Sequence, residues 1–586
     1  MKTLERNSKL INKKFIAYLI PSILMVFAMQ FGSLIDGILI GNLLGSEALS
    51  AASLVSPFIY IAQIPGFALG IGGSIVVANL LGKREIEKAK KVFSFCMIVG
   101  LAFSLFFAAL APLISRPIAC LFGPEFEELC YQYIFVYLLT DPLLTFALLI
   151  APFISVDNSP KLSSAIYIVG NGAKIGFEIL FISVFKMELY GAALSTGIGY
   201  ITGCLLILFY IFSKKRILKF SFKIKGCGIK DIIKSSSSYA INMLLMAVQM
   251  LVICIVIGSL NIETYQVLAY GLMANMVFVF DLICGGILNL IPTLCSLFYG
   301  EKDVYSLKSV TIKLFWLNLI VTLLILLVIA ITPTSYAIIF GFDVTDPKMA
   351  EINALLRLYV FSFIGYSINK FALNYYPSID KNSVAIVTTI CRELVIVLPV
   401  TLGLLYADGI EGYAIAAVIT ETVTSLIMAI YILIYNHKKK NIKGFFMIDK
   451  IDFVSYDVTV DNELENASVI SEELTNFAKI NKINEREAQV VGLAAEEMVN
   501  NIINYGYKTG RKAYIDVNLK VLDNLLILRI RDDGMPFDPT KYEFENDEKY
   551  STSGIYLIKN MVDKMTYLRI LNMNNTIFEI NLKGEN

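Results

Sequence analysis

Long apolar runs separated by short polar loops make up the first three quarters of the chain. Twelve of these runs are long enough to cross a bilayer, because a spanning helix needs about 20 predominantly apolar residues. The pattern predicts an all-α polytopic membrane bundle of twelve helices. Their approximate limits are 15–43, 50–81, 92–115, 129–155, 162–185, 189–212, 239–260, 264–299, 309–332, 352–376, 383–406 and 411–435.

The pattern changes after Lys440, where short alternating and helical segments replace the long apolar runs. In chain order, the predicted elements are a strand at 453–460, helices at 463–479 and 485–505, a hairpin of strands at 513–521 and 524–531, a polar loop at 533–553, a helix at 554–565 and strands at 566–571 and 576–582. This order predicts a separate α/β sandwich that is large enough to have its own core.

Composition and charge support this division. The chain has 586 residues, of which 56% are hydrophobic and 17% charged, and this composition excludes a purely soluble enzyme. Up to Lys440 there are 33 basic and 25 acidic residues, whereas the remainder has 17 basic and 24 acidic ones. No Walker-type phosphate loop occurs, and the single histidine, His437, lies in a basic run. ATP hydrolysis by a P-loop, and a kinase carrying its own phosphoacceptor histidine, are therefore excluded.

Loop charge predicts the orientation. The N-terminus and the loops at 83–91, 214–234 and 438–440 are strongly basic, whereas the alternate loops carry few basic residues. By the positive-inside rule, both termini and the C-terminal domain are expected on the cytoplasmic side of the cell (inner) membrane. The first apolar run lacks a small-residue cleavage site, so it is expected to be an uncleaved span.

An internal repeat divides the membrane part into two lobes. The second run ends in small residues and Gly82 followed by charges, and the eighth ends in the same way at Gly300, an offset of 218. Two six-helix halves in parallel orientation predict a cavity between lobes. The predicted domains are the N-lobe (1–220), the C-lobe (221–440), a linker (441–450) and a nucleotide-binding domain (451–586).

Asp36 lies inside the first apolar run, followed by Gly37 and Gly41. A carboxylate in the hydrocarbon is costly, so it is expected to face a cavity or pair with another group. It can bind a proton or sodium ion that drives exchange, or it can serve only to bond neighbouring helices.

The first 435 residues resemble the multidrug and toxic compound extrusion (MATE) family of cation-coupled antiporters. The motifs that carry the resemblance are Asp36-Gly37, Gly41, Leu44-Gly45, residues 48–51, Gly82-Lys83-Arg84, Asp157-Asn158 and residues 191–196. The resemblance implies export of organic, cationic solutes against inward flow of H⁺ or Na⁺. It also implies that Asp36 is the cation-responsive acid of the N-lobe.

The fifth predicted helix departs from the family, which usually has Asn and Asp four residues apart where this chain has Lys174 and Glu178. At this spacing the two side chains can form an ion pair, or they can line the substrate path. Asp281 is a candidate for the C-lobe cavity. Arg392 and Glu393 are expected near the cytoplasmic end of a span, where long side chains reach the lipid surface at little cost.

Three motifs stand in order in the C-terminal domain. Glu497 and Asn501 share one face of a predicted helix, where an acid can activate a hydroxyl and an amide oxygen can bind Mg²⁺. Asp532 and Gly534 follow at a strand end, where a buried Asp can accept a hydrogen bond from the adenine amine. Gly554 then opens a helix whose free amides suit phosphate.

This order resembles the GHKL (Bergerat-fold) ATPases and, most of all, their anti-sigma-factor serine kinase branch. The resemblance implies ATP and Mg²⁺ as cofactors, with Glu497 as catalytic base, Asn501 as magnesium ligand and Asp532 as adenine reader. Ser551 and Thr552 stand where two glycines are usual and are expected to hold phosphate through their hydroxyls. The implied partner is a small STAS-type anti-anti-sigma protein or a sigma factor, with no direct contact to nucleic acid.

Three functions remain open on the sequence alone. The first is a MATE-type antiporter in the lipid bilayer whose cytoplasmic ATP-binding domain regulates or signals. The second is a membrane receptor whose transporter-like half senses a ligand and whose C-terminal domain phosphorylates a serine or threonine of a partner. The third is a flippase for lipid-linked precursors.

Overall fold

The computed structural model describes residues 5–213, 216–259, 264–339, 347–439, 442–449, 453–508, 511–542 and 553–582. The chain divides into two compact units. One is the membrane unit, Tyr18–Ile448, and the other combines Met1–Ala17 with Asp449–Asn586. The second unit therefore draws on both ends of the sequence.

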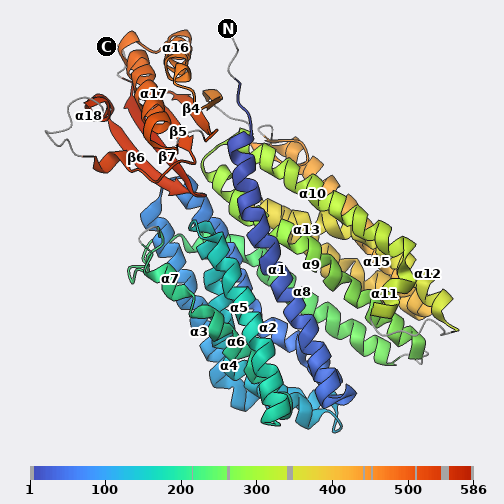
Figure 1. Ribbon diagram of the computed structural model, residues 1–586. Coiled ribbons are helices and arrows are strands. Elements are labelled where there is room, and N and C mark those ends of the chain that lie inside the picture. The colour runs from blue at the N-terminus through green and yellow to red at the C-terminus, as the bar shows by residue number, and fades with distance from the viewer. Residues whose placement is uncertain are drawn as a thin grey trace. The chain divides into compact units, whose positions relative to one another are not determined.

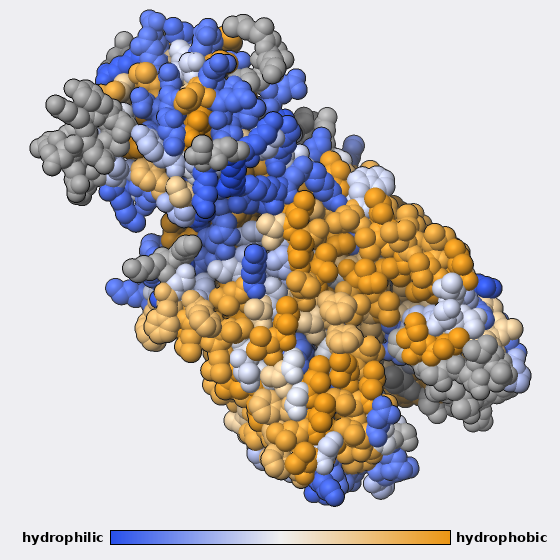
Figure 2. All heavy atoms as spheres, in the orientation of Figure 1, coloured by the Kyte–Doolittle hydropathy of each residue, from blue (hydrophilic) through white to orange (hydrophobic). Residues whose placement is uncertain are grey.

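Long helices build the membrane unit (Figure 1). Figure 2 shows that hydrophobic residues cover most of its visible surface, as a bilayer requires. In chain order the helices are α1 (Lys9–Leu44), whose first turns belong to the other unit, α2 (Ser46–Gly82), α3 (Ile86–Ala119), η1 (Cys120–Phe122), α4 (Glu127–Val156), α5 (Pro160–Ile179), η2 (Leu180–Val184), α6 (Glu188–Cys204), α7 (Ile207–Ile211), α8 (Ile229–Ser259), α9 (Thr264–Gly300), α10 (Val304–Ile331), α11 (Pro333–Ile339), α12 (Met349–Val360), α13 (Ser362–Ser378), α14 (Asn382–Ile390), η3 (Cys391–Val395) and α15 (Val397–Lys438).

Ten segments among the described residues are long and apolar enough to cross a membrane, whereas the sequence pattern predicts twelve. Two features of the helices explain the difference. The predicted helix 352–376 is divided at Phe361 into α12 and α13. The last two predicted helices lie in one segment, Asn382–Lys438, and a kink at Gly409 separates them. Gly409 has φ 59°, a conformation that glycine adopts without a steric penalty.

The predicted repeat has a structural counterpart where α2 of the N-lobe packs on α9 of the C-lobe. α2 ends at Gly82 and α9 ends at Gly300. A Cβ on Gly82 would overlap the carbonyl oxygen of Leu297, and a Cβ on Gly300 would overlap that of Asn79. The two lobes therefore touch backbone to backbone, and glycine is needed on both sides of the contact.

The predicted linker contains a short hairpin of β1 (Ile442–Lys443) and β2 (Ile448–Asp449). Its turn is bound to α13, because the hydroxyls of Tyr375 and Tyr376 donate to the carbonyl oxygens of Phe446 (2.8 Å) and Phe445 (2.9 Å). The two phenylalanine rings also pack against aromatic side chains of α10 and α13. The beginning of the linker is thus fixed to the C-lobe.

The C-terminal domain is an α/β sandwich with an antiparallel five-stranded sheet of order β3-β4-β5-β7-β6 (Figure 1). The fold class predicted from the sequence is confirmed, and each predicted strand and helix is present with small shifts of its ends. The elements are β3 (Val454–Asp461), α16 (Glu465–Ile480), α17 (Glu485–Tyr505), β4 (Tyr514–Leu522), β5 (Leu525–Asp532), η4 (Pro539–Lys541), α18 (Ser553–Met561), β6 (Lys564–Ile570) and β7 (Met573–Asn581).

The two faces of this sheet differ in polarity. Val517, Leu528 and Phe578 lie on one face, where they form a core with apolar residues of α16, α17 and α18. The alternate positions of the strands face the other way and include Asp516, which lies opposite Arg531 in the register of β4 and β5. The sheet therefore has an apolar face under the helices and a polar face opposite to it.

Candidate transport cavity and nucleotide site

A cavity of about 850 Å³ lies in the membrane unit, and both lobes contribute to its lining. Most of the lining is apolar or aromatic, but it includes ionisable side chains from six helical elements. The ionisable residues other than tyrosine are Asp36, Lys174, Asp281, Lys370, Arg392, Glu393 and Glu421. Of the four membrane residues predicted as site residues, Asp36, Lys174 and Asp281 line the cavity.

In the N-lobe, a close contact of α1 with α5 brings Asp36 and Lys174 together. A Cβ on Gly32 would overlap the Asn171 side chain, so α1 can approach α5 at this level because residue 32 is glycine. One turn further along, Lys174 Nζ lies 3.1 Å from Asp36 Oδ1. The lysine therefore supplies the charge that balances the acid of the first helix.

Glu178 lies one turn beyond Lys174 on α5 and is completely buried. Neither of its carboxyl oxygens accepts a hydrogen bond from the described residues, and the charged groups around it are Asp36 and Lys174. The ion pair that the spacing of Lys174 and Glu178 suggested is therefore replaced by the pair of Lys174 with Asp36. The reason is tertiary, because α1 brings a second carboxylate to the same lysine.

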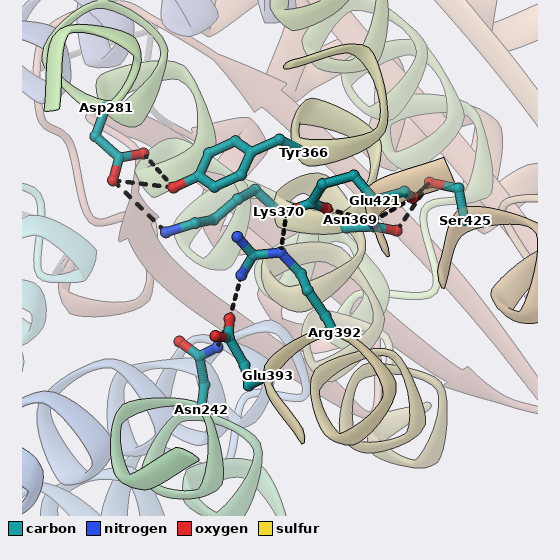
Figure 3. A network of polar contacts seen from close by, with 9 residues as sticks. All are labelled: Asn242, Asp281, Tyr366, Asn369, Lys370, Arg392, Glu393, Glu421 and Ser425. Carbon is teal, nitrogen blue, oxygen red and sulfur yellow. Dashed lines mark hydrogen bonds and ion pairs between the residues drawn. The ribbon is translucent and has the colours of Figure 1, made fainter. Parts of the chain in front are cut away.

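In the C-lobe, Arg392 is the centre of a polar network (Figure 3). Its Nε donates to Glu421 Oε1 at 2.8 Å, and its Nη1 contacts Glu393. The guanidinium also lies 4.6 Å from the ring centroid of Tyr366, within cation–π range. Asn369 donates to Glu421 Oε2 at 2.7 Å, so both oxygens of that carboxylate have donors.

A second pair extends the network. Lys370 Nζ lies 3.6 Å from Asp281 Oδ2, and the Tyr366 hydroxyl donates to the same carboxylate at 3.4 Å (Figure 3). Lys370 and Glu421 were missed by the sequence reasoning. Each is an ionisable residue within a predicted membrane helix, and that signal was sufficient to identify them.

The expectation that Arg392 and Glu393 reach the lipid surface was wrong, because both side chains are largely buried and line the cavity. Arg392 stands 218 residues after Lys174, which is the offset of the repeat. Each lobe thus places one cation at the equivalent position. The π-helical turn η3 contains Arg392, whereas in the N-lobe η2 begins six residues after Lys174; such turns are frequent at functional sites.

In the C-terminal domain, Asp532 at the end of β5 is buried. Its Oδ1 accepts hydrogen bonds from the Gly534 N–H (2.7 Å) and from Asn574 Nδ2 (2.9 Å). Burial raises the pKa of Asp532 to about 6, although these two donors act in the opposite direction. Among the described residues, no donor is directed at Oδ2, which leaves this oxygen open as a hydrogen-bond acceptor.

Gly534 permits the loop after Asp532 to pass close to the end of α17. A Cβ on Gly534 would lie 2.6 Å from the Gly506 carbonyl oxygen, which already accepts a hydrogen bond from the Met535 N–H at 2.8 Å. A larger residue at position 534 would displace this loop together with Asp532.

Glu497 and Asn501 share a face of α17, as predicted. The Asn501 side-chain nitrogen donates to the Glu497 carbonyl oxygen at 2.8 Å, so the amide oxygen points away from that bond. Gly554, in the first turn of α18, lies against the Glu497 carboxylate, which a Cβ at that position would overlap. The structure thus brings the first and third motifs together. Ser551 and Thr552 lie outside the described residues.

These residues fit an adenine nucleotide with Mg²⁺. Asp532 offers an open acceptor, Asn501 offers an oxygen ligand, and Glu497 lies beside the start of α18. A carboxylate, an amide oxygen and backbone amides at a helix start are the groups that such a ligand requires.

The membrane part matches a known family over more than half of the chain. The matching family model, MatE, covers residues 21–180 and 239–402. The chain belongs to the MatE family. The two matched stretches fall in the two predicted lobes, so the resemblance found in the sequence is confirmed for this transporter domain.

The C-terminal domain matches the family described as "Histidine kinase-like ATPase domain" over residues 460–577. This match includes all three motifs, and the family implies ATP binding. The chain is therefore a MATE transporter domain joined to a histidine kinase-like ATPase domain.

Similar proteins support the transporter fold. The multidrug export protein MepA of Staphylococcus aureus is 24% identical over 413 residues, which cover 68% of this chain and 90% of that protein. The MepA protein of Staphylococcus saprophyticus is 25% identical over 420 residues, covering 69% and 92%. An outward-facing MATE family multidrug resistance transporter has a TM-score of 0.66 at 18% identity, covering 74% of this chain and 99% of that one. A MOP superfamily transporter from Pyrococcus furiosus has a TM-score of 0.66 at 19% identity, covering 74% and 100%.

Proposed function

We propose that this protein exports monovalent organic cations in exchange for protons, and that its cytoplasmic domain binds ATP with Mg²⁺ to regulate or signal. The observation that carries the transport part is the group of Asp36, Lys174 and Glu178: two carboxyls, one fixed ammonium, and no donor among the described residues for Glu178. The MepA relatives, named as multidrug export proteins, favour the same class of substrate.

Charge balance supplies the mechanism. A buried carboxylate without a donor is strongly unfavourable, so Glu178 holds a proton while Lys174 balances Asp36. A protonated Glu178 can donate its hydrogen bond to Asp36. When an organic cation enters the cavity beside Asp36, it supplies the second positive charge and the proton can leave. The site then holds a proton or a substrate cation, but not both, which is the requirement for antiport.

The proton is favoured over sodium because a sodium ion would have to contact Asp36 directly beside Lys174, whereas the charge of a larger organic cation can lie further from the lysine within the cavity. Two like charges at about 3–4 Å repel strongly in a site of low dielectric constant. The cavity as a whole suits a substrate with one positive charge, since its lining carries one more acidic than basic residue. The acidic residues are Asp36, Asp281, Glu393 and Glu421, and the basic ones are Lys174, Lys370 and Arg392.

The test is efflux from proteoliposomes that contain the purified protein and a fluorescent organic cation such as ethidium. A pH gradient should drive transport, and a sodium gradient of equal size should not. The variant to be tested in this assay is Asp36→Asn. Its matched control is Asp408→Asn, which changes an acid in an exposed position. Transport that survives collapse of the pH gradient would exclude proton coupling. Translocation of a labelled lipid in place of ethidium would favour the flippase.

The C-terminal domain acts through residues at the ends of α17 and β5. Asp532 would accept a hydrogen bond from the adenine amine, Asn501 would hold Mg²⁺, and Glu497 would accept the proton of a partner protein's serine hydroxyl as it attacks the γ-phosphate and ADP leaves. Mg²⁺, when held there, would shield the charge of the triphosphate. Basic loops favour a cytoplasmic location for this domain, where ATP and a STAS-type partner are present.

A fluorescent ATP analogue tests this part. Wild-type protein should bind the analogue in the presence of Mg²⁺, Asp532→Asn should not, and Asp523→Asn, in the exposed turn between β4 and β5, should bind as wild type. If the Asp532 variant binds equally well, the proposed nucleotide site is wrong. If ligand stimulates phosphate transfer and no transport occurs, the protein is a receptor.

A further inference from the structure

The N-terminal segment, residues 5–14, contacts the C-terminal domain although more than 440 residues separate them in sequence. Met1–Ala17 belong to the same compact unit as the domain. The contact begins at the edge strand β3, where the Thr459 N–H donates to the Glu5 carbonyl oxygen at 3.4 Å. The Thr459 hydroxyl accepts from the Asn7 N–H (3.2 Å) and donates to the Asn7 carbonyl oxygen (3.0 Å).

The segment follows the polar face of the sheet. Arg6 Nη2 lies 2.9 Å from Asp516 Oδ2, and both side chains are buried. Lys9 Nζ lies 5.0 Å from the ring centroid of Tyr514. An acidic domain with a polar sheet face is a complementary surface for a segment that carries four basic residues, namely Arg6, Lys9, Lys13 and Lys14.

The segment ends at the nucleotide site. Lys13 Nζ lies 2.6 Å from Asp533 Oδ2, and Lys14 Nζ lies 3.9 Å from the same oxygen. The Asp533 side chain is only 2% exposed, and Arg511 pairs with it from within the domain at 2.7 Å. Asp533 stands between Asp532 and Gly534, so its position fixes the backbone of both.

Lys14 also makes a second contact with the C-terminal domain. Its Nζ donates to the Asn572 carbonyl oxygen at 3.0 Å, in the tight turn between β6 and β7. Two residues later, Asn574 donates to Asp532 Oδ1. The two lysines therefore hold both structures that orient Asp532, the loop after β5 and the start of β7.

We propose that residues 5–14 complete the nucleotide site of the C-terminal domain, with Lys13 and Lys14 as positioning residues for Asp532. This inference rests on the proposed nucleotide site at Asp532. It means that the membrane protein's own N-terminus, which continues without a break into α1, is part of the ATPase domain's structure. It also means that nucleotide affinity depends on a segment that is lost when the C-terminal domain is isolated.

The experiment is titration of the full-length protein in detergent with a fluorescent ATP analogue. The variant Lys13→Gln/Lys14→Gln should bind about tenfold more weakly, because the buried Asp533 loses two of its three cations. Lys13→Arg/Lys14→Arg should restore binding. The matched control, Lys223→Gln/Lys225→Gln, removes two exposed lysines elsewhere and should bind as wild type.

A double-mutant cycle separates positioning from a general effect on folding. Since the lysines act through Asp533, their substitution should cause little further loss in an Asp533→Asn background. Additive losses, or wild-type affinity of the Lys13→Gln/Lys14→Gln protein, would overturn the inference as long as Asp532→Asn abolishes binding. If Asp532→Asn also binds as wild type, the error lies in the proposed nucleotide site instead.

Discussion

In the N-lobe, Lys174 pairs with Asp36 while Glu178 receives no donor from the part of the chain that the structure describes; in the C-lobe, Arg392 contacts Glu393 and Glu421. The two cations are equivalent in the repeat, but their surroundings differ. The C-lobe network supplies donors to its carboxylates, so a proton has little to add there. In the proposed mechanism, the N-lobe leaves one carboxyl to be satisfied by a proton. By that mechanism, duplicated positions would have diverged into a titrating site and a fixed one.

The largest expected effect is on coupled transport. Glu178→Gln should reduce pH-driven efflux by about 100-fold, equivalent to roughly 2.8 kcal/mol, because the amide cannot release a proton when substrate enters. Efflux from proteoliposomes under a fixed pH gradient measures this loss. Glu411→Gln, at an exposed position, is the control. If Glu421→Gln in the C-lobe abolishes coupling and Glu178→Gln does not, the assignment of the lobes must be reversed.

The next effect is on stability. Arg392→Met should destabilise the protein by about 3–5 kcal/mol, because two buried carboxylates lose their common cation. Lys174→Met should cost less, since Asp36 and Glu178 can share protons. Thermal unfolding of the two purified variants in the same detergent compares them. If both variants lose the same stability, the C-lobe cluster is not fixed and the N-lobe cluster titrating, as proposed.

The contact between the lobes allows a symmetric test. Gly82→Ala and Gly300→Ala should each cost about 1–3 kcal/mol, because the new methyl group overlaps a backbone carbonyl oxygen that cannot move independently. Gly403→Ala is the matched control, since a Cβ at that helical position meets no atom within 4 Å. Unfolding temperatures measure the effect. A loss at only one of the two glycines would mean that the lobes do not share this contact equally.

Asp532 can be compared with Glu178, because it is also a buried acid but accepts hydrogen bonds from two donors. Because its pKa is raised to about 6, nucleotide affinity should fall as the pH decreases from 7.5 to 5.5, by up to about tenfold per pH unit below that pKa. The proton would sit on Oδ2, since Oδ1 already accepts two hydrogen bonds, and would convert the adenine acceptor into a donor. Titrations with the ATP analogue at several pH values measure the change. Affinity that stays constant across this range would contradict the role of Asp532.

The direction of this pKa shift also predicts how Asp532 affects the stability of the folded domain. A carboxyl whose pKa is higher in the folded than in the unfolded state favours folding when it is protonated. Ionisation of Asp532 above about pH 6 therefore costs stability, and Asp532→Asn should leave the domain at least as stable as wild type at pH 8. This variant should therefore lose nucleotide binding and keep its stability.

The sequence predicted those features that depend on local pattern. The strands and helices of the C-terminal domain follow their hydrophobic periodicity. Three short motifs identify its candidate site residues, which are Glu497 with Asn501, then Asp532, then Gly554. The partner of Lys174 was not predictable, because the spacing on α5 favoured Glu178 and only the approach of α1 at Gly32 brings Asp36 within reach. The break at Phe361 was also hidden, since hydropathy alone does not record backbone geometry, whereas the kink at Gly409 lies between the predicted helices 383–406 and 411–435.

The hairpin turn held by Tyr375 and Tyr376 has a consequence for how the chain connects the two units of the protein. α13 carries both tyrosines and also Lys370, so the hairpin that follows α15 is bound to a helix that lines the cavity. The other end of the ATPase domain is joined to α1, which carries Asp36. The chain thus passes from one unit to the other at two places, within α1 and just after the hairpin that α13 holds. A change in the spacing of α1 and α13 would therefore change the distance between the two points at which the membrane unit is joined to the rest of the chain.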